Sequence, residues 1–109
     1  MLLFCGRRIL MRVEGLSMWP TLSAGDRVLV KAIPEHASLP DPGTIVVSQH
    51  PSRPNHRLIK RLAEVDSTGA MILLGDHPAQ STDSRQLGPI PRSCLIGSVQ
   101  TVVRQTSKH

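Results

Sequence analysis

The sequence contains few aromatic residues and no long apolar run. Its 109 residues include one phenylalanine, one tryptophan and no tyrosine, so a folded core has to be aliphatic. The apolar run at residues 1–5 is far shorter than the ~20 residues of a membrane-spanning helix. Arginines follow this run instead of preceding it, which is not the order of a secretory signal. We therefore expect no membrane span and a cytoplasmic protein, at most peripheral to a membrane.

Cysteine and histidine are equally uninformative about metals. Cys5 and Cys94 are the only cysteines, and their spacing matches neither a redox motif nor a zinc motif. No two of the five histidines have the spacing of metal ligands on a helix. We predict reduced thiols, no metal and no cofactor.

The formal net charge of +5 raises nucleic acid as a partner. Apart from Arg7, Arg8 and Arg12, however, the basic residues are dispersed, and one tryptophan gives no series of stacking platforms for single strands. We expect a basic soluble surface and no nucleic-acid partner. A non-catalytic basic β-barrel that binds nucleic acid remains the alternative from a different functional class.

The length suits one domain over 1–109, with a flexible extension at 1–8 and a flexible tail at 104–109. Alternating or continuous apolar patterns between Pro- and Gly-rich turns predict strands, and no helical period appears. The strands are expected at 9–14, 26–33, 44–50, 57–65, 70–75 and 95–103.

These segments predict an all-β fold, either a small partly open β-barrel or two antiparallel sheets, with long polar loops and little helix. We expect 26–33 to pair with 44–50 in antiparallel fashion, and 57–65 to form a hairpin with 70–75. The polar connection at 76–93 is long for a small domain, which favours a functional role.

Ser17 is the first candidate for chemistry. Gly15 and Pro20 flank it in a stretch that predicts a tight, stiff turn, which would hold the hydroxyl of a nucleophile in place. A serine that only caps the turn is the simpler interpretation. Trp19 stands where the G-x-S-x-G motif of hydrolases requires glycine, so a histidine-based triad is not indicated.

Lys60 is the better candidate for a base. It lies between Leu58 and Leu62 on the apolar face of a predicted strand. Burial disfavours the ammonium form and lowers the pKa of a lysine, and Ser-Lys pairs are a recurring variant of serine catalysis. The alternative is a structural lysine whose stem covers the sheet while its head reaches water.

Four stretches resemble, in order, the motif boxes of the type I signal peptidase family of Ser-Lys peptidases. Ser-Met-x-Pro-Thr-Leu is followed by Gly-Asp-x-Val-Leu-Val, then by a Lys-Arg pair and by Gly-Asp-x(4)-Ser-x-Asp-Ser-Arg. These boxes lie at 15–22, 25–30, 58–61 and 75–88. The resemblance implies a serine endopeptidase that acts on a protein precursor.

By this resemblance Ser17 is the nucleophile and Lys60, within the pair Lys60-Arg61, is the general base. Ser81 would orient the lysine amine, and the supporting residues would be Asp76, Asp83, Arg85 and Arg61. The hydroxyl that assists the oxyanion in some members falls at Gly15, which leaves the Ser17 amide as the donor from this segment. Members of this family usually have asparagine at the position of His77.

The short chain, with Gly88-Pro89-Ile90-Pro91 after the last box, looks most like the nickel-type superoxide dismutase maturation peptidases. That group removes an N-terminal prosequence and so exposes a nickel-binding N-terminus. The alternatives within the enzyme class are a soluble peptidase for another precursor and a self-cleaving repressor domain, whose DNA-binding part does not precede Ser17.

Met18 and Trp19 adjoin the predicted nucleophile and are our candidates for lining a substrate cleft. Substrate would bind there as an extended strand, with pockets for alternate side chains. For Trp19, a role in capping the core is an equally good interpretation, because tryptophan is often largely buried.

Overall fold

The computed structural model describes residues 7–104, and six strands form the framework of this part of the chain. The strands are β1 (Arg8–Arg12), β2 (Arg27–Ala32), β3 (Ile45–His50), β4 (Arg53–Val65), β5 (Met71–Leu74) and β6 (Leu95–Val103). Helical structure in this part of the chain is limited to η1 (Pro78–Gln80), α1 (Ser84–Leu87) and η2 (Arg92–Cys94). The predicted all-β fold with little helix is confirmed.

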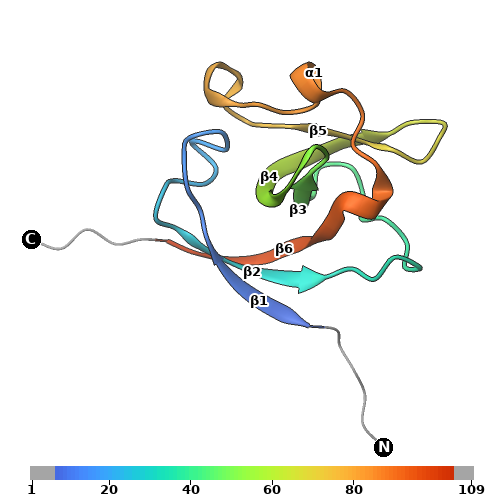
Figure 1. Ribbon diagram of the computed structural model, residues 1–109. Helices are drawn as coiled ribbons and strands as arrows, with labels where there is room; N and C mark the ends of the chain where they lie inside the picture. The colour runs from blue at the N-terminus through green and yellow to red at the C-terminus, as the bar shows by residue number, and fades with distance from the viewer. Residues whose placement is uncertain (1–6, 105–109) are drawn as a thin grey trace, which may run out of the picture.

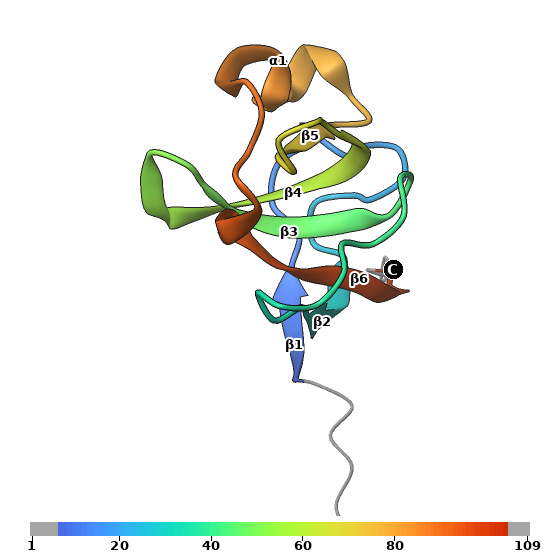
Figure 2. The ribbon, with the colours of Figure 1, turned by 90° about the vertical axis from the view of Figure 1, so that its right-hand side faces the viewer.

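The strands form one antiparallel sheet in the order β1-β2-β6-β3-β4-β5. The sheet is open, since β1 and β5 lie at its two ends (Figure 1). Figure 2 shows this order from bottom to top, with α1 above β5 and β1 at the opposite end.

One predicted pairing is wrong. Segments 26–33 and 44–50 do not pair with each other, because β6 lies between β2 and β3. The long, proline-containing connection at 33–44 leaves room for a third strand, and Gly97 of β6 allows close packing against β2. A Cβ at Gly97 would meet the Val30 side chain at 2.8 Å and the Lys31 backbone closer still.

The other hairpin is as predicted. β4 pairs with β5, and β3 with β4. β4 begins at Arg53, however, although Pro54 and Asn55 had predicted a loop there. A register shift after Gln49 lets the ladder continue into the hairpin, as far as the pair His50 and Arg53.

The core is aliphatic, as the composition predicts, and β3 divides it into two clusters. Val47 belongs to one cluster and its neighbour Val46 to the other, since successive side chains of a strand point to opposite faces. The first cluster contains Val13, Met18, Leu22, Val28, Val30 and Val47, and the second Val46, Leu62, Met71, Leu73, Ile90 and Leu95. Ser17 and Lys60 both stand beside this core.

Arg8 and Arg104, at the inner ends of the two segments expected to be flexible, both contact the folded domain. Arg8 is the first residue of β1 and pairs with Lys31. Arg104 donates hydrogen bonds to the Thr21 carbonyl at 2.6 Å and to Asp26 at 3.2 Å. Cys94 is a free thiol, whereas Cys5 lies outside the described residues. None of the helices between residues 7 and 104 has the length and apolar character needed to cross a membrane.

Candidate functional site

Ser17 lies in a compact turn that connects β1 to β2. Gly15 has φ +76°, a conformation that favours glycine. The Trp19 N–H donates to the Leu16 carbonyl at 3.1 Å, and the Leu22 N–H donates to the Met18 carbonyl at 2.8 Å. Because Met18 and Leu22 are buried in the core, the turn is anchored from below while Ser17 stays partly exposed.

Lys60 lies on β4 with only 4% of its surface exposed. It pairs with Val46 of β3, and the flanking residues Leu58 and Leu62 are buried as the alternation predicts. Burial lowers the pKa of the Lys60 ammonium below its usual range, the negative charge of Asp83 opposes this, and the positive charge of Arg85 lowers the pKa further.

Ser17 and Lys60 line the same groove, which has a volume of about 470 Å³. The edge strand β1 supplies Met11 to this groove, and β4 supplies His56 and Arg57. Within residues 7–104, neither the Ser17 hydroxyl nor the Lys60 amine makes a hydrogen bond, so both are available to a molecule bound in the groove.

Asp76 joins the Ser17 turn to the lysine strand. Arg61 binds its carboxylate in bidentate fashion, with Nε to Oδ1 at 2.9 Å and Nη2 to Oδ2 at 2.6 Å. The Thr21 hydroxyl donates to the same Oδ2 at 2.6 Å, and the Asp76 N–H donates to Met18 Sδ at 3.4 Å. The hydrogen bonds from Arg61 lower the pKa of Asp76, burial raises it less, and the net shift is downward.

Asp83 is the centre of a second network and is fully buried. It accepts hydrogen bonds from the Ser81 hydroxyl at 2.7 Å, from the Gly75 N–H at 2.7 Å and from Arg85, whose Nη2 is 2.6 Å away. Burial alone would raise the pKa of Asp83, but these hydrogen bonds outweigh it and hold the pKa well below its usual range. Asp83 also caps α1 through Gln86 in a capping box.

Gly75 brings this network against the Ser17 turn. A Cβ at Gly75 would lie 2.7 Å from both the Ser17 carbonyl oxygen and Ser81 Cβ. Since real Cβ atoms do not approach other atoms so closely, the position requires glycine. The predicted residues Ser17, Ser81, Asp83 and Arg85 therefore come together through a residue for which the sequence had suggested no role.

Met18 and Trp19 do not share one role. Met18 is 1% exposed and belongs to the core, so the expectation that it lines the cleft is corrected: the side chain points under the turn, not into the groove. Trp19 is 49% exposed and lies against His77, with ring centroids 5.6 Å apart. This exposure argues against a role in capping the core.

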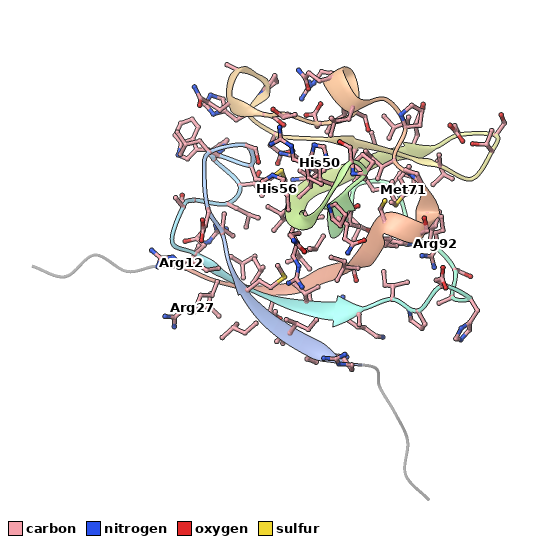
Figure 3. All side chains as sticks on the ribbon, in the orientation of Figure 1. Arg12, Arg27, His50, His56, Met71 and Arg92 are labelled. Carbon is pink, nitrogen blue, oxygen red and sulfur yellow. The ribbon has the colours of Figure 1, made fainter. Side chains whose placement is uncertain are left out.

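Two other histidines lie at the β3–β4 hairpin. His50 and His56 contact each other with ring centroids 5.7 Å apart (Figure 3). Burial, with nearby Arg53 and His56, lowers the pKa of His50, whose Nδ1 accepts from the Ser52 N–H at 3.1 Å. In the described part of the chain, no three His, Cys, Asp or Glu side chains are grouped to hold a metal ion.

Three features of the site were missed from the sequence. Thr21 binds Asp76, Gly43 offers its carbonyl to Arg61 Nη1 at 2.8 Å, and His56 lines the groove. Thr21 lies inside the serine motif, so its place there was a signal that could have been followed. The other two depend on tertiary contacts and left no local signal.

Comparison with known proteins shows the family of the chain. The family model described as "Signal peptidase, peptidase S26" matches residues 4–66 and 65–104. Mitochondrial ATP-independent inner membrane protease subunit 1b of Arabidopsis thaliana is 31% identical over 107 residues, covering 78% of this chain and 63% of the relative. Mitochondrial inner membrane protease subunit 1 of Mus musculus is 30% identical over 105 residues, covering 79% and 63%.

The chain thus spans slightly less than two thirds of the length of these relatives. The family match extends over all of the described residues and includes both the serine turn and the lysine strand. The chain belongs to the signal peptidase family, peptidase S26.

Proposed function

We propose that the protein is a serine endopeptidase in which Ser17 is the nucleophile and Lys60 the general base. The observation that carries this proposal is that Ser17 and the buried Lys60 line one groove. The downward pKa shift of Lys60 supports the same roles, because a larger fraction of the amine is then neutral near pH 7.

The proposed reaction begins when the neutral Lys60 amine removes the proton from Ser17 Oγ as that oxygen attacks the scissile carbonyl. The Ser17 N–H would stabilise the oxyanion. The C–N bond then breaks, and the Lys60 ammonium returns the proton to the leaving amine. Water, deprotonated by Lys60, then attacks the acyl-enzyme. As the ester C–O bond breaks, the Lys60 ammonium returns the proton to Ser17 Oγ, and the second product is released.

The supporting residues act on the electrostatics and placement of this pair. Asp83 favours the ammonium form of Lys60, whereas Arg85, which binds Asp83, acts in the opposite direction together with burial. Ser81 donates its proton to Asp83, which leaves its oxygen lone pairs as acceptors for the lysine amine. Asp76 and Arg61 keep the serine turn next to β4.

We further propose that the substrate is the proform of a nickel-type superoxide dismutase, and that processing takes place in the cytoplasm. The support is that the short chain and the order of its motifs resemble those of the maturation peptidases of that enzyme. The relatives are subunits of mitochondrial inner membrane proteases, which makes a membrane-associated precursor the second candidate.

Substitution of Lys60 separates a general base from a structural lysine. Lys60→Met keeps the apolar stem without the amine. Lys60→Arg keeps a positive charge, and arginine stays protonated at any accessible pH, so it cannot act as a base. We expect both variants to fold and to lose about 10²-fold or more in kcat/KM on a precursor that the wild-type protein cleaves. Lys31→Met is the matched control. Near-normal cleavage by both folded Lys60 variants would contradict the assignment and direct attention to His56.

The pH dependence of cleavage follows from the same pKa shift. The base acts in its neutral form, so kcat/KM should rise with pH and level off above the pKa of Lys60 in the free enzyme. Because this pKa is lowered, the rise should be centred below the ~10.4 of an unperturbed lysine. A rate that falls over this range, or a rise centred at the unperturbed value, would count against a buried base.

The substrate proposal is tested by incubating the purified protein with a nickel superoxide dismutase proform. Intact mass and N-terminal sequence of the product should show one cut that exposes the nickel-binding N-terminus, and Ser17→Ala should produce none. If the proform stays intact while a membrane-protein precursor is cut in a Ser17-dependent manner, the substrate assignment is wrong and the peptidase assignment stands.

A further inference from the structure

His77 contacts the Ser17 turn at three points. Its backbone N–H donates to the Ser17 carbonyl at 2.8 Å. Its ring nitrogen Nδ1 lies 3.2 Å from the Leu16 carbonyl oxygen, and the ring packs against Trp19. One residue thus holds the carbonyls on both sides of the serine, although it lies 60 positions further along the chain.

The contact with Leu16 fixes the protonation of the ring. A carbonyl oxygen only accepts hydrogen bonds, so Nδ1 has to carry a proton. The neutral ring is therefore the Nδ1–H tautomer, and the protonated ring keeps the same donor. The contact persists in both charge states, unlike the action of a histidine base, which requires a neutral acceptor nitrogen.

The position of the Leu16 carbonyl controls the donor proposed for the oxyanion. The peptide between Leu16 and Ser17 is planar and trans, so its C=O and N–H point in opposite directions. The Trp19 N–H already binds this carbonyl from within the turn at 3.1 Å. A second donor from outside the turn restrains rotation of the whole peptide plane, including the Ser17 N–H.

We infer that His77 is a positioning residue that, through its Nδ1–H bond to Leu16, orients the Ser17 N–H for the oxyanion of bound substrate. This inference rests on the proposed role of Ser17. The contact of the ring with Trp19 keeps the imidazole in the orientation that the hydrogen bond needs. His77 and Trp19 are not among the described residues that line the groove, so the effect should appear in the chemical step and not in binding.

Three substitutions test the role of Nδ1. In asparagine the amide nitrogen is bonded to Cγ, as Nδ1 is in histidine, so His77→Asn can restore the donor. His77→Gln places its amide one bond further out, and His77→Ala has no donor. On a precursor that the wild-type protein cleaves, the kcat of His77→Asn should stay within about 3-fold of the wild-type value. The kcat of the other two variants should fall ~10- to 100-fold with little change in KM.

The matched control is His36→Asn, at an exposed histidine in the loop after β2, which should leave kcat unchanged. Urea unfolding of all variants separates positioning from loss of fold. Full kcat in folded His77→Ala, or a loss confined to KM, would overturn the inference. An equal loss in the Asn, Gln and Ala variants at unchanged stability would also overturn it.

A spectroscopic measurement tests the hydrogen bond between His77 and Leu16 independently of enzymatic activity. Long-range ¹H–¹⁵N NMR of the wild-type protein distinguishes protonated from unprotonated ring nitrogens, and the His77 signals are those absent from His77→Asn. At a pH where the ring is neutral we expect the proton on Nδ1. A proton on Nε2 refutes the inference. If the tautomer is as expected but the wild type cleaves no precursor, the proposed function fails and the contact remains.

Discussion

The arrangement of the site depends on the carboxylate of Asp76. It accepts two hydrogen bonds from Arg61 on the lysine strand and one from Thr21 in the serine turn. An ion pair between a planar guanidinium and a carboxylate fixes orientation as well as distance. The two segments are far apart in the sequence, and Asp76 joins them directly. Asp76 therefore helps to set how Ser17 lies relative to Lys60.

The second constraint is electrostatic. A buried carboxylate beside Lys60 would normally keep the lysine charged and unable to accept a proton. Asp83 still raises the pKa of Lys60, but the positive charge of its partner Arg85 acts in the opposite direction. Burial of Lys60 then dominates, and its pKa moves downward. Gly75 and His77 connect this network to the serine turn, so the short segment 75–77 links the electrostatic and the positional parts of the site.

Local patterns predicted much of this structure and failed where tertiary contacts decided. Alternation around Lys60 predicted its burial, and the motif order indicated the residues now found around Asp83. The pairing of β2 with β3 was wrong because the position of β6 is not encoded next to either strand. Met18 was misassigned because a turn residue can point into a core as well as out of it. Contacts such as Thr21 with Asp76 join residues 55 positions apart, which no periodicity reveals.

The central claim is that Lys60 takes the proton of Ser17, and a crystal structure with an extended peptide bound in the groove tests it most directly. Crystals kept at a pH where the lysine is neutral should show Ser17 Oγ and Lys60 Nζ about 2.6 to 3.2 Å apart, or joined by one water molecule. Two well-ordered side chains separated by more than one bridging water would contradict the account.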